Sequence, residues 1–330
     1  MKENQIIEQI KKLPKVELHL HLDGSISTEL ASQLSGLSVD EVKKKMIAKD
    51  KCQNLSEYLT KFDFPISLMQ TKENLTLIAK DLVDRLASQE VIYAEIRFAP
   101  MFHTKGGLTY EEIVEAVLEG LKSNSKIHTN LILCMMRGMN KEDNLKTIEV
   151  AKKYLNKGVC ALDLAGAEDK YPIDNYLELF KIAHQKGIPF TIHAGENGSA
   201  EEVRKAIEIG ATRIGHGIHS IEDEKVLDLI KSKKILLEIC PTSNIQTNAV
   251  KDYNNHPIQK LYNLGIKVNI NTDNTTVSNI SLTEEYLKLY STFHFKVSEY
   301  QEMNLYALNS AFLSNEEKQS LIKKINKFML

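Results

Sequence analysis

Cysteine is scarce in this chain, and no mark of an exported protein is present. The 330 residues include four cysteines (Cys52, Cys134, Cys160 and Cys240), and no two of them form a CxxC pair or a disulfide-like spacing. Unpaired cysteines are typical of a reducing compartment. The first residues, MKENQIIEQIKKLPKVE, are charged throughout and lack the apolar stretch of a secretory signal. We therefore expect a cytoplasmic protein.

Long hydrophobic runs and an excess of one charge are also missing. No run of about 18 apolar residues occurs, so we expect no membrane-spanning helix. The 42 Lys and Arg residues and 44 Asp and Glu residues leave a net charge of −2. This balance provides no basic field to hold nucleic acid or an anionic membrane. The expected partner is a small molecule, and the oligomeric state stays open.

Several common catalytic motifs are absent as well. The chain has no GxxxxGK[ST] phosphate loop, no GxGxxG and no GxSxG nucleophile elbow. It also lacks the HxE and PCxxC pair of the cytidine-deaminase fold. Glycine and proline, at 15 and 7 residues, are too few for a low-complexity chain. These absences leave a globular enzyme of another class.

What the chain does contain is a regular alternation of apolar and helical segments. Short apolar runs rich in Val and Ile predict strands at 16–24, 91–100, 131–138, 159–166, 188–196, 211–217, 234–244 and 266–274. Helical periodicity fills the intervals at 108–123, 144–158, 174–187, 199–210, 223–233 and 256–265.

Eight strand–helix units in a row favour an α/β fold of the (β/α)₈ barrel type. An open doubly wound sheet is the alternative. Extra helical material lies after the first strand, including 55–69, and the tail 281–330 is expected to cap the barrel. No linker composition divides the chain, so we expect a single domain over residues 1–330.

The active site of such a barrel gathers at the carboxyl ends of the strands. His19 and His21 lie two apart on the first strand and therefore point the same way, toward the interior. Two adjacent imidazoles in a partly buried place are typical of a divalent metal site. The structural alternative is a pair of histidines bonded to backbone.

Later strand ends add further candidate ligands and a carboxylate that carries protons. His193 is followed by Gly195 and Glu196, and the glycine allows the chain to turn and direct Glu196 into the pocket. Asp273 ends the last strand. The alternatives are helix-start roles for Glu196 and Asp273.

His216 stands between two glycines, where small neighbours would let another group approach its ring; the alternative is a core histidine. Three histidines and one aspartate form a donor set suited to zinc, with one position left for water. No strand end carries a lysine placed to bridge two metals, so we expect one Zn²⁺ per chain.

Six ordered segments resemble the adenosine deaminase family of metal-dependent amidohydrolases. They are ELHLHLDGS (17–25), DLAGAE (163–168), TIHAGE (191–196), RIGHG (213–217), CPTSN (240–244) and NTDN (271–274). The resemblance implies zinc-dependent hydrolytic deamination of adenosine, and of 2′-deoxyadenosine, to inosine and ammonia in purine salvage.

The resemblance also implies a role for each matched residue. His19, His21, His193 and Asp273 bind zinc, and Asp273 also orients the nucleophile. Glu196 carries protons to purine N1, and His216 positions and deprotonates the metal-bound water. His21, Asp23 and Gly166 face the substrate, with Asp23 at the ribose 5′-hydroxyl and Gly166 at N3. Phe62 and Phe64 fall where the family places an apolar lid.

One position departs from the family pattern. Asn274 stands where many members carry a second aspartate that faces purine N7. An asparagine amide donates a hydrogen bond without needing an extra proton, so we expect purine binding to be kept. The remaining alternatives are an adenine or other aminopurine deaminase, which tends to carry Glu in place of Asp23, and a binding protein that keeps only the fold.

Overall fold

Eight short segments rich in Val, Ile and Leu form parallel strands. The computed structural model describes residues 3–328. The strands are β1 (Lys15–His21), β2 (Val91–Phe98), β3 (His128–Met136), β4 (Val159–Ala165), β5 (Thr191–Ala194), β6 (Arg213–His216), β7 (Leu236–Ile239) and β8 (Lys267–Ile270). The residue range of each strand overlaps one of the ranges where the sequence predicts a strand. Nearly all their residues are buried, as expected for parallel strands covered on both faces.

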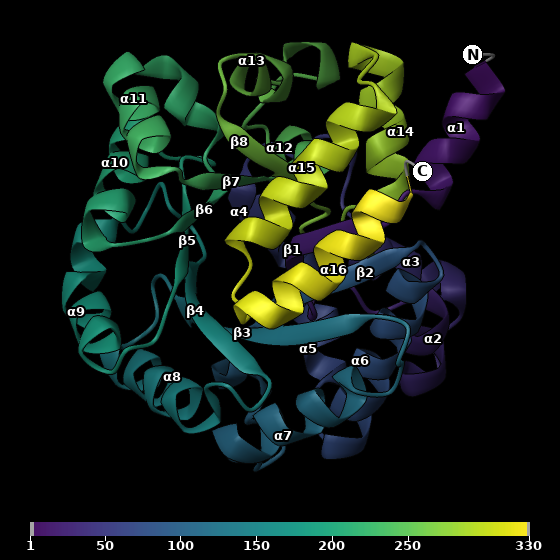
Figure 1. The fold of residues 1–330 in the computed structure, drawn as a ribbon. Helices are drawn as coiled ribbons and strands as arrows, with labels where there is room; N and C mark the ends of the chain where they lie inside the picture. Colours follow the sequence, from purple (N-terminus) through teal and green to yellow (C-terminus); the bar gives the residue numbers. More distant parts are fainter. Residues whose placement is uncertain (1–2, 329–330) are drawn as a thin grey trace.

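Helices follow the strands and pack around them. They are α6 (Lys72–Ala87), α7 (Tyr110–Leu121), α8 (Lys141–Tyr154), α9 (Leu177–Gln185), α10 (Ala200–Ile209), α11 (Glu224–Lys233), α13 (Ile258–Asn263) and α14 (Leu282–Phe293). Thr109 and Glu112 form a capping box that starts α7, and Gly210 ends α10 with a φ of +112°. Figure 1 shows these helices surrounding the strands, which is the (β/α)₈ arrangement that the sequence predicts.

The barrel consists of two four-stranded halves that meet at two seams. Strands β1 to β4 form one continuous parallel ladder and β5 to β8 form the other. The halves meet at β4 and β5 where the Leu162 N–H donates to the Pro189 carbonyl at 2.9 Å. The second seam joins the last strand of the barrel to the first.

At this second seam the backbone of Asp273 bonds to both predicted histidines of β1. The Asp273 N–H donates to the His19 carbonyl at 3.0 Å, and the His21 N–H donates to the Asp273 carbonyl at 2.7 Å. The Asn271 side-chain oxygen accepts the N–H groups of Leu18 and His19 at 2.8 and 3.1 Å. A side chain thus replaces part of the ladder, and seam closure brings residues 19, 21 and 273 together.

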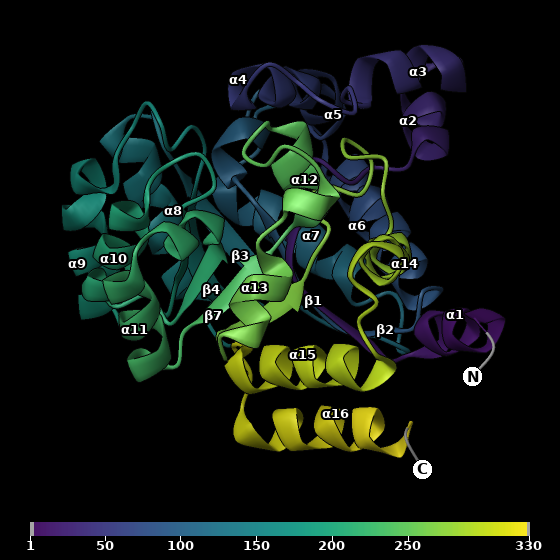
Figure 2. The same cartoon turned by 90° about the horizontal axis from the view of Figure 1, so that it is seen from above.

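Additional helices cover both ends of the barrel. Helix α1 (Glu3–Lys12) precedes β1. Helices α2 (Thr28–Ser35), α3 (Val39–Met46), α4 (Leu55–Leu59) and α5 (Asp63–Leu68) lie between β1 and β2, and α15 (Val297–Ser310) and α16 (Asn315–Lys327) end the chain. Figure 2 shows α2 to α5 at one end and α15 and α16 at the other. The helices between β1 and β2 and those at the C-terminal end agree with the prediction of extra helical material in these two regions. Among the described helices, none has the length and apolar character that crossing a membrane requires.

The prediction that the seventh strand runs to residue 244 is wrong. Strand β7 stops at Ile239, and Pro241 begins the short helix α12 (Pro241–Gln246). Proline has no N–H to give a strand ladder but suits the first turn of a helix, where that N–H has no partner. The CPTSN segment therefore turns over the barrel mouth instead of extending the sheet.

Candidate active site

A cavity of about 510 Å³ opens among the loops that follow the strands. Its lining includes most of the residues that the sequence singled out: His21, Asp23, Phe62, Gly166, His193, Glu196, His216, Asp273 and Asn274. Their convergence follows from the barrel, because parallel strands end at one rim.

Three histidines and one aspartate meet at the floor of this cavity. The Nε2 atoms of His19 and His21 lie 3.0 and 3.2 Å from Nε2 of His193. Oδ1 of Asp273 lies 3.4 Å from the Nε2 atoms of both β1 histidines. Zinc–nitrogen bonds of 2.0–2.1 Å in tetrahedral geometry place ligand atoms about 3.3 Å apart. The spacing and chemistry of these donors therefore fit a single zinc-sized ion.

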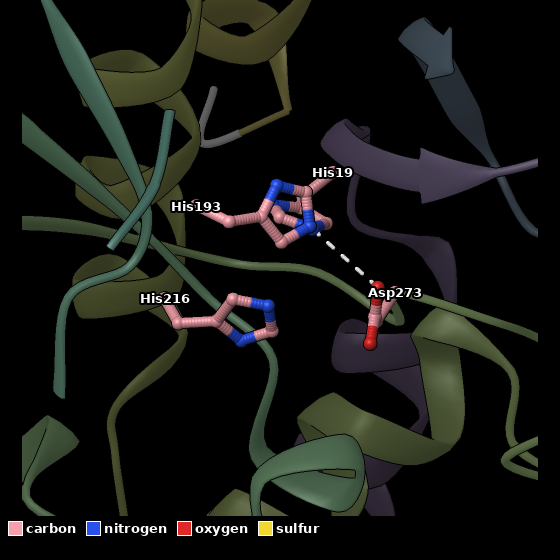
Figure 3. A group of neighbouring side chains, drawn as sticks. All are labelled: His19, His193, His216 and Asp273. Carbon is pink, nitrogen blue, oxygen red and sulfur yellow. Dashed lines mark hydrogen bonds and ion pairs between the residues drawn. The ribbon is translucent and has the colours of Figure 1, made fainter. Parts of the chain in front are cut away.

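His216 is a fifth neighbour of this cluster. One ligand atom each from His19, His193, His216 and Asp273 lies within 4.8 Å of the others, and Figure 3 shows the four side chains around one space. Nδ1 of His216 lies 3.0 Å from the Asn244 amide nitrogen, which donates to it. Its Nε2 is buried without a hydrogen-bond partner and lies 3.6 Å from Oε2 of Glu196. Burial, reinforced by the neighbouring His19, holds the pKa of His216 well below its usual value, so the ring is neutral.

Glu196 is a buried carboxyl with a single side-chain hydrogen bond. Thr247 Oγ1 donates to its Oε1 at 3.2 Å. Burial, with the carboxylates of Asp273 and Glu168 nearby, raises the pKa of Glu196 well above its ordinary range. A raised pKa favours the protonated carboxyl, the form that can donate a proton into the cavity.

Asp273 is ionised in the same surroundings. Burial alone would raise its pKa, but the hydrogen bond from His19 and the charges of His21 and His19 outweigh burial and lower it. Ser243 Oγ donates to Oδ2 at 2.6 Å. Asp273 and His216 both have a left-handed backbone, with φ of +61° and +62°. Such conformations are uncommon in non-glycine residues and often mark functional sites.

Three of the predicted substrate-facing residues described here line the cavity, and one does not. Asp23 and Gly166 line the cavity, and burial raises the pKa of Asp23 to about 7 while its Oδ1 has no hydrogen-bond partner. Phe62 lines the same cavity from the turn between α4 and α5. Phe64 is not among the residues that line this cavity: its ring packs against the core, and Nζ of Lys45 lies 5.5 Å from the ring centroid. Phe62 and Phe64 are two residues apart on a helical turn, so their rings lie on different sides of it: one toward the cavity and one toward the core.

Asn274 lines the cavity with a partner that the sequence did not reveal. Its Nδ2 donates to the Tyr58 hydroxyl at 3.0 Å, and that hydroxyl lies 2.7 Å from Ser278 Oγ. Its Oδ1 is buried without a partner beside Gly24, where an added Cβ would fall 1.8 Å away. The glycine of the HLDG segment is therefore needed for close packing against Asn274.

A layer of buried charges beneath the cluster was also missed. Nδ1 of His19 lies 2.9 Å from Glu238 Oε2, and Nδ1 of His193 lies 2.9 Å from Asp163 Oδ2. Both carboxylates also bind Arg97, at 2.8 Å from Glu238 and 2.9 Å from Asp163. These contacts direct each Nε2 toward the cluster, as carboxylate partners of metal-binding histidines do.

The same layer continues toward the closed end of the barrel. Arg213 Nε donates to Glu238 Oε1 at 2.7 Å, and its Nη2 lies 2.5 Å from Glu95 Oε2. The guanidinium also lies 4.1 Å from the Phe312 ring centroid, at the turn between α15 and α16. The signal in the sequence was a charged residue inside an otherwise apolar strand, as in YAEIRF and LLEI.

Comparison with known proteins gives the family. The family model described as "Adenosine deaminase" matches residues 14–328. The chain belongs to the adenosine deaminase family. An adenosine deaminase from Clostridium acetobutylicum is 42% identical, over 97% of this chain and 99% of the relative. Membership makes the chain a hydrolase of carbon–nitrogen bonds and a member of the amidohydrolase superfamily.

Solved structures of related deaminases share the fold. An adenine deaminase from Arthrobacter aurescens has a TM-score of 0.88 at 25% identity, covering 96% of this chain and 99% of its own. The N6-methyl-AMP deaminase from Arabidopsis thaliana has a TM-score of 0.86 at 28% identity, covering 97% and 98%. The barrel is thus common to family members whose names give different substrates.

The buried charge layer predicts that Arg97 is a main determinant of stability. Arg97→Met removes the cation between two buried carboxylates and should lower the free energy of unfolding by about 3–5 kcal/mol. Arg204→Met, which removes exposed ion pairs on α10, should cost at most about 1 kcal/mol. Denaturant unfolding of both variants measures the difference, and equal losses would contradict the prediction.

Proposed function

We propose that this chain hydrolyses adenosine and 2′-deoxyadenosine to inosine and ammonia with one Zn²⁺ per chain. The observation that carries the proposal is geometric: Oε2 of Glu196 lies 3.6 Å from the unpartnered Nε2 of His216, and both side chains line the cavity at the edge of the His and Asp donor set. Such a pair can give a proton to a ring nitrogen and take one from water. Full-length identity of about 42% to an adenosine deaminase supports the choice of substrate.

The metal is proposed to bind through His19, His21, His193 and Asp273. His216 is left out of the set because its unpartnered Nε2 faces Glu196 and its Nδ1 accepts from Asn244. Zinc held there would supply Lewis acidity that lowers the pKa of a water in the site toward about 7. His19 and His193 are held for this task by Glu238 and Asp163.

The proton steps are assigned to three side chains. Glu196 donates its proton to purine N1, which makes C6 electrophilic. His216 accepts one proton from the water whose oxygen bonds to C6, while Asp273 orients that water. The C6–N6 bond then breaks: the proton held by His216 passes to N6 and lets ammonia leave, and the remaining hydroxyl proton returns to Glu196 as the C6 carbonyl forms. Water is consumed, one ammonia is released and no electrons are exchanged.

The remaining cavity residues are proposed to bind the nucleoside. Asp23, whose Oδ1 has no partner in the protein, is assigned to the ribose 5′-hydroxyl, and Gly166 is assigned to purine N3. Asn274, held by Tyr58, is assigned to N7. Phe62 is assigned to the apolar lid. Aspartate at position 23 is shorter than glutamate and leaves more room for a ribose, which favours a nucleoside over free adenine.

A substrate panel tests this proposal. Adenosine, 2′-deoxyadenosine, 7-deazaadenosine, adenine and AMP are each mixed with purified protein, and the ultraviolet change on deamination is followed. Adenosine and deoxyadenosine should react with the highest kcat/KM, and 7-deazaadenosine should react more slowly because it offers no N7 to Asn274. A preference for adenine or AMP would contradict the assignment of Asp23 to the ribose 5′-hydroxyl. No reaction with any compound would support a protein that binds purines without converting them.

Metal analysis of the same preparation tests the donor set. The protein should hold about one zinc per chain, since only one ion fits the described cluster, and dialysis against a strong chelator should abolish turnover. His21→Ala should lower zinc content, whereas His216→Ala should keep zinc and lose turnover. Two metals per chain, or loss of zinc in the His216 variant alone, would overturn the assignment.

Glu196→Gln separates the catalytic role of Glu196 from a structural one. The variant keeps shape and volume but has no carboxyl proton to give, so kcat should fall by about 10²-fold or more. Zinc content and binding of ground-state purine nucleoside analogues should stay at wild-type levels. If Glu196 served only as a residue near the start of a helix, kcat would hardly change, and that result would defeat the proton assignment.

A further inference from the structure

Glu168 occupies an unusual place beside the proposed acid. It ends the DLAGAE segment after β4, and only 4% of its surface is exposed. Its carboxylate accepts four consecutive backbone N–H groups of the loop after β5. Gly195 donates to Oε1 at 2.6 Å, while Glu196, Asn197 and Gly198 donate to Oε2 at 3.1, 3.3 and 3.1 Å.

The loop is shaped around this carboxylate. Gly195 has a φ of +68°, which turns the chain just before Glu196. A Cβ on Gly198 would fall 2.4 Å from Glu168 Oε1, so a side chain there would displace the carboxylate. Four donors on one buried carboxylate, two of them from glycines, define the path of residues 195–198. Direction of the Glu196 side chain follows from that path.

Glu168 also has a buried countercharge that connects it to the metal-site strand. Arg137 is 5% exposed, and its positive charge lowers the pKa of Glu168 against the larger opposing effect of burial. Arg137 Nη2 donates to the carbonyl of His193 at 2.8 Å. The carboxylate and the guanidinium thus hold the two ends of the HAGE segment that carries a metal-facing histidine and the proposed acid.

We propose that Glu168 is a positioning residue that holds the 195–198 loop so that the Glu196 carboxyl meets purine N1. The proposal rests on the function proposed above, in which Glu196 protonates N1. Glu168 itself touches neither substrate nor metal, because its oxygens are taken up by the loop. A displacement of about 1 Å in a catalytic group costs on the order of 10²-fold in rate. Loss of the four bonds is therefore visible in turnover.

The test is Glu168→Gln, measured with a substrate and with an analogue that lacks N1. An amide nitrogen cannot accept the N–H groups of the loop, so the variant loses one of the four contacts where the nitrogen replaces Oε1 and three where it replaces Oε2. We expect kcat for adenosine to fall by about 10- to 100-fold, with zinc content close to wild type and a cooperative thermal transition that, although lowered, leaves the variant folded at the assay temperature. The inhibition constant of 1-deazaadenosine should stay unchanged, because this analogue makes no bond to Glu196 at position 1. A higher inhibition constant would show a general distortion of the pocket and overturn the proposal.

A double variant adds an independent readout. If Glu168 acts through Glu196, then Glu168→Gln should cost little further activity in a Glu196→Gln background. Multiplied losses would overturn the proposal. Glu112→Gln is the control: Glu112 also accepts a backbone N–H, that of Thr109 at 2.9 Å at the start of α7, and does not bond to the 195–198 loop. Its kcat should match the wild type.

The outcomes separate this inference from the proposed function. Near-normal kcat in Glu196→Gln defeats the proton assignment. Slow turnover in Glu196→Gln with normal turnover in Glu168→Gln defeats only the positioning role. Should the glutamine variant fail to fold, Glu168→Asp keeps the charge but falls one methylene short, and it should show the same selective loss. If both variants lose zinc and fail to fold, Glu168 is a folding residue and the proposal fails.

Discussion

The guanidinium of Arg97 is the contact on which the site depends. It lies fully buried on β2 and binds Asp163 on β4 and Glu238 on β7, which in turn hold His193 and His19. Removing two carboxylates from water is costly unless a partner compensates for each. Because the positive charges of Arg97 and the neighbouring side chains compensate, the pKa values of Asp163 and Glu238 stay well below their usual range despite burial. The carboxylates are thus ionised and able to hold both imidazoles.

This arrangement makes the interior of the barrel unusually polar for its depth. Arg213 and Glu95 extend the charges to the end covered by α15 and α16, where the Phe312 N–H donates to Glu95 Oε1 at 2.7 Å. The strands therefore support the site by hydrogen bonds as well as by packing. Polar networks of this kind stabilise one arrangement when every member is paired. The turn between α15 and α16 is part of this network through the Phe312 N–H.

Much of the fold and the site could be predicted from sequence because periodicity and strand ends are local. The eight strand segments, the helices between them and both added helical regions agree with the structure. Glu196, His216 and Asp273 could be singled out because each follows or ends a strand next to a polar or glycine residue, and His19 and His193 because a histidine is unusual within an apolar strand. The end of β7 was placed too late because Pro241 was not given its weight as a helix starter.

The remainder depends on distances across the barrel that no local pattern contains. Glu238 and Arg97 come from strands that are far apart in sequence, and only closure brings them together. The Tyr58–Asn274 bond joins an inserted helix to the last strand end, so it depends on how that helix lies over the mouth. Phe62 and Phe64 differ by two positions, and the helical turn alone determines which ring faces the cavity.

Closure of the barrel between β8 and β1 also determines when, during synthesis of the chain, the site can form. Two of its donors belong to the first strand and one to residue 273, where the last strand meets the first. As the chain is synthesised from its N-terminus, His19 and His21 are made early and have no partner until the eighth strand has emerged. A product that ends before Asp273 lacks both the seam and the carboxylate. The complete candidate donor set therefore forms only after the eighth strand has been synthesised, and an ion bound by all four of its residues would require the whole barrel.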